Sequence, residues 1–171
     1  MGGGRVKNPE LIIIGAGPGG IAAAVEAARA GVSVKILDEN PKPGGRIYGQ
    51  LNEGLKLVNP GFLGPDYEKG KSLLTEFDAF HEKIDYLHDA LVFVSIANRV
   101  LEFHQAGQGQ RLSFTQLIVA SVAYDRPGPG QGWTLPGVLT AGGAQNLVKM
   151  QCVFPGKNIL LAGSGPLQLF V

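Results

Sequence analysis

The sequence has little of what builds cross-linked or metal-bound frameworks. Its 171 residues include one cysteine, three histidines and one tryptophan. A single cysteine excludes an internal disulfide framework, a zinc ribbon and a CxxC redox pair. His81, His88 and His104 lack metal-ligand spacing, so we expect them at the surface and predict no metal site. Cys152 is followed by apolar side chains and is expected in an apolar core.

Excess charge and long apolar runs are lacking as well. Fifteen basic and fourteen acidic residues leave a net charge of +1, which predicts no surface for nucleic acid or anionic lipid. A transmembrane helix needs about 20 apolar residues. The stretch 11–24 is interrupted by Gly-Pro-Gly-Gly and followed by Glu26 and Arg29. We therefore expect no transmembrane segment, no nucleic-acid partner and a cytoplasmic location.

Glycine, in contrast, is abundant. It accounts for 26 of the 171 residues, roughly twice the usual share of about 7%. There is no Gly-x-y period, and abundant Ile, Leu and Val argue against a low-complexity linker. The positions of the glycines therefore decide the interpretation.

The first part of the chain has the pattern of a βαβ unit. Residues 11–14 are an apolar run typical of a buried parallel strand, and residues 33–37 are a second one. Between them, residues 21–30 are rich in alanine and predict a helix that packs closely on a sheet. The whole unit has about 30 residues, the size that a right-handed crossover needs.

The rest of the chain mixes further helices and strands. We expect an amphipathic helix over 71–83 whose apolar spacing continues to Ile84. The other expected elements are three β segments in an antiparallel meander (90–96, 99–104, 111–114), a buried strand (117–120), a loop (126–137), a helix (141–151) and a strand (158–162). The sequence thus predicts an α/β, Rossmann-like fold, with a parallel sheet, crossover helices and a β-meander.

A glycine motif lies between the first strand and the first helix. Residues 15–20, Gly-Ala-Gly-Pro-Gly-Gly, are GxGxxG. Gly15 permits the tight turn, Gly17 lets the backbone approach a pyrophosphate, and Gly20 lets helix and strand pack closely. The helix N-terminus adds partial positive charge. A purely structural glycine-rich turn is the alternative.

An acidic pair and a second glycine pair follow. Asp38 and Glu39 stand 23 and 24 residues after Gly15, where a carboxylate can accept hydrogen bonds from ribose hydroxyls. Gly44 and Gly45 then offer a second close backbone approach. A simple NAD domain does not need this second approach, whereas an extended flavin dinucleotide benefits from it.

These segments together resemble a known family. LIIIGAGPGG, the acidic pair, PGGRIYGQ, LIVAS and ILLAGSGPLQL are similar to the two-dinucleotide-domain flavoproteins of the glutathione-reductase-like superfamily. The run AYDRP…GWTLPGVLTAGGAQNLVK resembles the flavoprotein subunits of opine oxidase and hydrogen cyanide synthase, and dye-linked proline dehydrogenases. The resemblance extends over nearly all of residues 9–171.

The resemblance implies an FAD site. In it, Gly15, Gly17, Pro18, Gly19 and Gly20 hold the pyrophosphate, Asp38 or Glu39 holds the adenosine ribose, Gly44, Gly45 and Arg46 pass near the pyrophosphate and ribityl chain, Val92 contacts adenine through its backbone, and Ala120 and Ser121 close over the cofactor. No general base stands out, so the catalytic residues stay unassigned.

The resemblance also implies a division of the chain. Residues 1–8 form a flexible lead-in, 9–155 the N-terminal part of an FAD-binding domain, and 156–171 the truncated start of a second dinucleotide-binding-like domain. The glycine motif of this second domain has Gly163 and Gly165 as its first two glycines. Gln168 stands in place of the third, which counts against NAD(P) binding there.

The implied function is that of a flavoprotein oxidoreductase, or one subunit of it. It would oxidise a small amine or amino-acid derivative and pass electrons to another subunit or acceptor. Two alternatives stay open: the NAD(P)-binding domain of a dehydrogenase, and a truncated, non-catalytic flavin-binding fragment. Disulfide reduction is excluded, because the relatives that perform it carry a cysteine pair where this chain has Ile-Tyr-Gly-Gln at 47–50.

One rival motif fails on spacing. Residues 69–72, Lys-Gly-Lys-Ser, end like a P-loop, but the first glycine of that motif would be Pro65. We therefore expect no P-loop in this segment.

The residue after Ser121 tests the flavin interpretation. The family usually has Ala-Thr-Gly where this chain has Ala120, Ser121 and Val122. A branched side chain there hinders a close backbone approach, so Val122→Gly is expected to raise FAD retention. Flavin content per purified chain measures this, and equal content in both proteins would contradict it.

Overall fold

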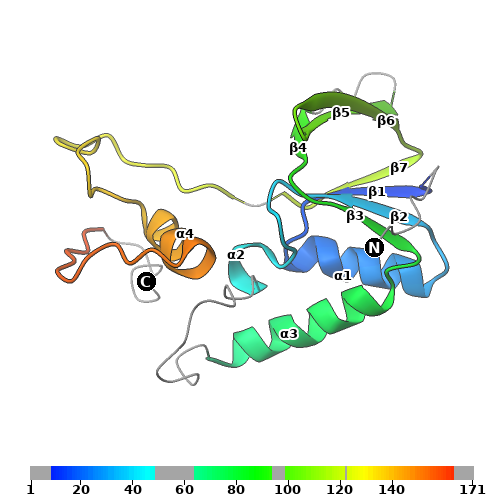
Figure 1. Ribbon diagram of the computed structural model, residues 1–171, viewed down its shortest axis with the longest axis horizontal. Coiled ribbons are helices and arrows are strands. Elements are labelled where there is room, and N and C mark those ends of the chain that lie inside the picture. Colours follow the sequence, from blue (N-terminus) through cyan, green and yellow to red (C-terminus); the bar gives the residue numbers. More distant parts are fainter. Residues whose placement is uncertain (1–8, 49–63, 94–98, 122, 164–171) are drawn as a thin grey trace. The chain divides into compact units, whose positions relative to one another are not determined.

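Four parallel strands form the central sheet of the computed structural model, which describes residues 9–48, 64–93, 99–121 and 123–163 (Figure 1). In spatial order they are β3 (Ile84–Leu87), β2 (Val34–Leu37), β1 (Leu11–Ile14) and β7 (Gln116–Val119). The chain divides into two compact units, Met1–Gly49 with Gly61–Val122 and Gln50–Pro60 with Ala123–Val171. The sheet belongs to the first unit, and the predicted division at 155/156 stays a prediction.

Alternate residues of β1 serve two separate cores. Ile13 packs with Ile36 and with helix α1 (Pro18–Arg29), whereas Ile12 packs with Leu101 on the opposite face. Successive side chains of a strand point to opposite faces, so a run of four apolar residues is buried on both sides. This confirms the strands predicted at 11–14 and 33–37 and the helix between them.

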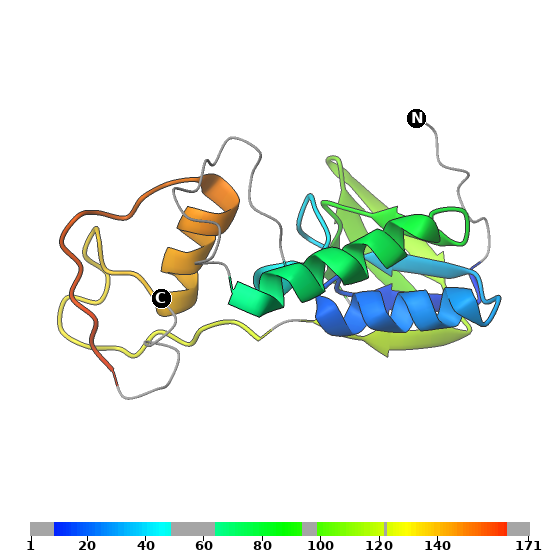
Figure 2. The same cartoon turned by 90° about the horizontal axis from the view of Figure 1, so that it is seen from below.

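The two faces of the sheet carry different layers. Figures 1 and 2 show α1 and α3 (Gly64–Ala79) on one face and the meander on the other. The meander consists of β4 (Leu91–Phe93), β5 (Val100–Gln105) and β6 (Gln108–Ser113), paired antiparallel in that order. The predicted parallel sheet, crossover helix and meander are confirmed; residues 94–98 of the first meander segment lie outside the described residues.

The helix predicted over 71–83 was placed wrongly. It begins at Gly64 and ends at Ala79, and Ile84 opens strand β3, which pairs with β2. After the helix the chain reverses in a tight turn, in which the Ile84 N–H donates to Phe80 O at 2.9 Å. The apolar spacing through Phe77 and Phe80 therefore continues to Ile84 although the helix has ended. Both the helix and the strand face the same core, so their apolar positions merge into one pattern.

The strand predicted at 117–120 is present as β7, but the prediction that it is buried is wrong. Val119 is 60% exposed. The reason is that β7 lies at the edge of the described sheet, paired only with β1. A continuous apolar run predicts burial on both faces only when neighbours cover both.

The second unit contains one helix among its described residues, α4 (Ala141–Gln151), as predicted. Thr140 caps it by accepting from Gly143 N at 3.1 Å, and Asp125 accepts from Gly142 N at 2.7 Å. The predicted loop over 126–137 is confirmed, since turns but neither helix nor strand occur there.

Two predictions for this unit are wrong. Residues 158–162 form no strand, and Leu160 is 93% exposed. A strand needs a partner for its backbone hydrogen bonds, and the described residues of this unit include none. Cys152 is exposed rather than buried, because it ends α4 in the left-handed region (φ 55°), beyond the last helical turn.

An ion pair is buried within the sheet of the first unit. The Lys35 Nζ lies 2.6 Å from Asp85 Oδ2, and their side chains are 6% and 15% exposed. They face each other across β2 and β3, in register. Removing one partner of such a pair leaves an uncompensated buried charge.

Asp85→Asn is therefore expected to lower the free energy of unfolding by about 3 kcal/mol. Replacing both partners with apolar residues, Lys35→Met with Asp85→Leu, should restore most of this. Glu102→Gln, which breaks the exposed pair with Arg111, is the matched control and should cost less than about 1 kcal/mol. Urea unfolding measures all three, and equal losses for Asp85→Asn and Glu102→Gln would contradict the buried-charge explanation.

Candidate functional site

The predicted glycine motif forms a tight loop from the end of β1 to the start of α1. Gly15 has a φ of 99°, and a Cβ added there would lie 2.5 Å from Ala120 O. A Cβ on Gly20 would overlap Gly15 O. The loop is also tied to the neighbouring strand, because Gly15 N donates to Leu37 O at 2.7 Å. Only glycine fits at these two positions.

The loop leaves the start of α1 open. Gly17 is the N-cap residue and has no side chain to cap the helix, and Pro18 follows at the first helical position. The first turn contains no acidic residue. Gly19 is exposed, and a Cβ added there would meet nothing within 4 Å. The N–H groups and the helix dipole at such an end favour an anion.

The second glycine pair packs directly on this loop. Gly44 N donates to Ala16 O at 2.8 Å, and a Cβ on Gly45 would lie 2.9 Å from Gly17 Cα. Both glycines are buried and have positive φ angles, 118° and 59°. Gly45 opens the short helix α2 (Gly45–Tyr48), which also contains the half-buried Arg46. The structure thus brings together two segments that the sequence could only pair by analogy.

The acidic pair divides into a buried and an exposed residue. Asp38 is 6% exposed, and its Oδ2 accepts from Ala16 N at 2.5 Å. Its Oδ1 accepts from both the backbone N and the Nδ2 of Asn40, each at 2.7 Å. Glu39 is exposed. Of the two carboxylates that the sequence left open, the Asp38 carboxylate therefore contacts the glycine loop.

Asn40 was missed by sequence reasoning. The signal was available, since an aspartate that accepts from the backbone N–H two residues later forms an Asx-turn, for which Asp and Asn are favoured. Asp38 and Asn40 have this spacing. The turn fixes the direction of the Asp38 carboxylate, which the motif alone does not specify.

The other predicted residues lie at the ends of neighbouring strands. Ala120 N donates to Ile14 O at 2.8 Å, and Ala120 and Ser121 follow β7 beside Gly15. Val92 lies on β4, and the preceding Ala90 donates to Asp38 O at 2.8 Å. The start of the meander thus reaches the acidic turn. Val122, Gly165 and Gln168 lie outside the described residues.

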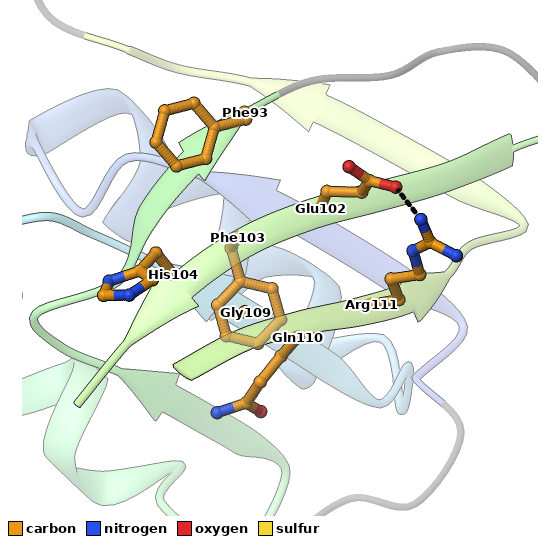
Figure 3. A pocket seen from close by; sticks show the side chains of 7 residues that line it. All are labelled: Phe93, Glu102, Phe103, His104, Gly109, Gln110 and Arg111. Carbon is orange, nitrogen blue, oxygen red and sulfur yellow. Dashed lines mark ion pairs between the residues drawn. The ribbon is translucent and has the colours of Figure 1, made fainter. Parts of the chain in front are cut away.

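A separate hollow of about 380 Å³ lies on the meander (Figure 3). Phe93, His104 and Arg111 contribute to its lining, and Figure 3 shows Arg111 paired with Glu102. It shares no lining residue with the glycine segments. The candidate site is therefore the loop region at the carboxyl ends of β1 and β2, where nucleotides bind in open α/β sheets.

Two other findings concern metals and membranes. His81, His88 and His104 are all exposed, as predicted. Within the described residues, no group of three or more His, Cys, Asp or Glu side chains could hold a metal ion. Among the described helices, none combines the length and the apolar character that crossing a bilayer requires.

Comparison with known proteins identifies relatives that match nearly the whole chain. It is 40% identical over 166 residues to an opine oxidase subunit from Agrobacterium tumefaciens (strain Ach5), covering 92% of this chain and 32% of that protein. It is 37% identical over 162 residues to the HcnB subunit of hydrogen cyanide synthase from Pseudomonas aeruginosa, covering 94% and 34%. The chain therefore spans about a third of the length of these relatives.

A solved structure shares the fold. The L-proline dehydrogenase from P. horikoshii superimposes with a TM-score of 0.69 at 18% identity, covering 86% of this chain and 29% of that one. The predicted Rossmann-like class is thereby confirmed. The profile of the FAD dependent oxidoreductase family matches residues 10–122, which hold the parallel sheet, the meander and both glycine segments. The chain belongs to the FAD-dependent oxidoreductase family, and its cofactor is FAD.

Proposed function

We propose that the two glycine segments and Asp38 bind the diphosphate and adenosine ribose of FAD in one subunit of an amine-oxidising oxidoreductase. The observation that carries this proposal is the packing of Gly45 against Gly17, where an added Cβ would lie 2.9 Å from the Gly17 Cα. This packing places the backbone of the second glycine segment beside the open start of α1, where both segments can approach one ligand closely.

The residues present suit a flavin dinucleotide. Gly15, Gly20 and Gly45 stand where a Cβ would meet backbone atoms, so the two segments can form one smooth backbone surface. Gly19 borders open space at the helix start. A diphosphate there gains the helix dipole and the N–H donors of the first turn. The two oxygens of the Asp38 carboxylate carry about four lone-pair sites, and three protein donors use three of them. The remaining site can accept a hydrogen bond from a ribose hydroxyl.

The chain's own residues bind and orient, and the redox chemistry belongs to the cofactor. When bound, FAD accepts two electrons and a proton equivalent from the substrate. Gly17, Gly19 and Gly20 hold the diphosphate at the helix start, and Arg46 lies on the segment that follows the second glycine pair. Ala120 and Ser121 close the loop from the end of β7.

The names of the relatives support the substrate and partner class. Opine oxidase and L-proline dehydrogenase are named for compounds that contain an amine nitrogen, and the opine oxidase and hydrogen cyanide synthase relatives are named as subunits. We therefore infer that the substrate is a small amine or amino-acid derivative and that the electron acceptor is a second oxidoreductase subunit.

Gly19→Ala separates cofactor contact from folding. Beyond its chain neighbours and the backbone of its own helix, the added methyl meets no heavy atom within 4 Å. The thermal midpoint should therefore not fall, but the methyl stands where the diphosphate must approach. We expect the dissociation constant for FAD to rise at least about tenfold, or roughly 1.4 kcal/mol. Gly109→Ala on β6, also with open space around it, is the control and should leave FAD affinity unchanged. Flavin fluorescence titration measures both, and equal affinity in the two variants would contradict the assignment.

The activity is tested by anaerobic reduction. The FAD-loaded chain is mixed with a secondary amine such as L-proline, and the bleaching of flavin absorbance and the reduction of an artificial dye are followed. We expect both. Tight FAD binding without bleaching would instead favour a non-catalytic flavin-binding fragment, and tighter binding of NAD(P) than of FAD would favour a dehydrogenase domain.

A further inference from the structure

A polar chain of contacts leads from the glycine loop to strand β3. The Asp38 carboxylate accepts from Ala16 N, in the middle of the loop, and from the side chain and backbone of Asn40. The carbonyl oxygen of Asn40 in turn accepts from the Tyr86 hydroxyl at 3.1 Å. Asp89 N also points to this carbonyl, at a longer 3.4 Å. Tyr86 therefore supplies the shorter of the two contacts to the Asn40 carbonyl oxygen.

The backbone and the side chain of Asp38 are held by different partners. Its backbone is fixed on both sides, since Asp38 N donates to Leu87 O at 3.0 Å and Ala90 N donates to Asp38 O at 2.8 Å. Its carboxylate is directed by Asn40 and Ala16. A shift of Asn40 would thus release the direction of the carboxylate without unfolding the strand.

Tyr86 is well suited to hold this position. Its ring packs edge-on against Phe77, with 6.0 Å between centroids and an interplanar angle of 82°. Burial, assisted by the negative charges of Asp38 and Asp89, raises the pKa of Tyr86. The hydroxyl therefore stays protonated at neutral pH and well above it, and can donate to Asn40 throughout that range.

The structure assigns Tyr86 as a positioning residue for the flavin site: its hydroxyl holds Asn40, Asn40 directs the Asp38 carboxylate, and this carboxylate holds the Ala16 N–H. The inference rests on the proposed function of the glycine loop. It adds a residue on β3 that belongs to none of the cofactor-binding segments.

Such a brace matters because the loop is rich in glycine. Glycine loses more conformational freedom on ordering than any other residue, and a loop ordered before binding avoids that loss when the ligand arrives. Ala16 is the one non-glycine, non-proline residue of 15–20. Its N–H is held by Asp38 and its carbonyl by Gly44 N at 2.8 Å. Ala16 is thus the point at which the acidic turn and both glycine segments meet.

The first test is a double-mutant cycle on FAD affinity. Tyr86→Phe removes one hydroxyl and keeps the ring against Phe77. We expect it to raise the dissociation constant for FAD about three- to tenfold. In an Asp38→Ala background the same change should add less than about twofold, because the contact that transmits the effect is gone. Tyr67→Phe on α3 is the matched control and should leave affinity unchanged.

A purely structural role of Tyr86 would give a different result. Lost packing or stability would weaken FAD binding by the same factor with and without Asp38. Equal factors in both backgrounds, or an unchanged dissociation constant for Tyr86→Phe, would overturn the inference.

The second test needs no flavin. Amide hydrogen exchange of the 171-residue chain should show Ala16 N–H exchanging about three- to tenfold faster in Tyr86→Phe, with Ile13 N–H in β1 unchanged. An unchanged exchange rate of the Ala16 N–H would overturn the inference that Tyr86 positions the loop. If the unaltered chain fails to bind FAD, the proposed function fails for this chain, while the exchange of Ala16 still decides whether Tyr86 holds the loop.

Discussion

The backbone contact between Gly15 and Gly20 is the constraint on which the rest of the site depends. It brings the first turn of α1 against the end of β1, with no space for a Cβ at Gly20. Gly15 in turn lies against the carbonyl of Ala120 at the end of β7. Three chain segments therefore meet at one point, and any side chain there would push the start of α1 away from the sheet.

The charges around this point are arranged to leave the helix start available. The first turn of α1 has no acidic residue, while Asp38 directs its carboxylate to Ala16 N within the loop. A buried carboxylate is tolerated only when hydrogen bonds compensate it, and Asp38 has three such donors. The backbone of the loop thus holds the negative charge of Asp38, and no acidic residue in the first turn of α1 offsets the partial positive charge of the helix end.

Local patterns predicted most of the first unit and the helix of the second. The apolar runs at 11–14 and 33–37, the alanine-rich helix, the meander and the helix at 141–151 follow from short-range spacing, and all are present. The errors arose where a pattern has two meanings. Ile84 continues a helical spacing yet begins β3, and residues 158–162 are apolar enough for a strand but form none. Both outcomes depend on whether a partner strand lies beside the segment. The residues of the segment alone do not decide this.

The sequence by itself determined the glycine loop, its acidic partner at the end of β2 and the family, because these depend on residue types at fixed short spacings. Only the tertiary structure decided that the Asp38 carboxylate contacts the loop, that Gly45 lies on Gly17, and that Tyr86 reaches Asn40. Asp38 lies 22 positions from Ala16, and Tyr86 lies 46 positions from Asn40. Contacts over such separations follow from strand order and register, which residue spacing along the chain does not specify.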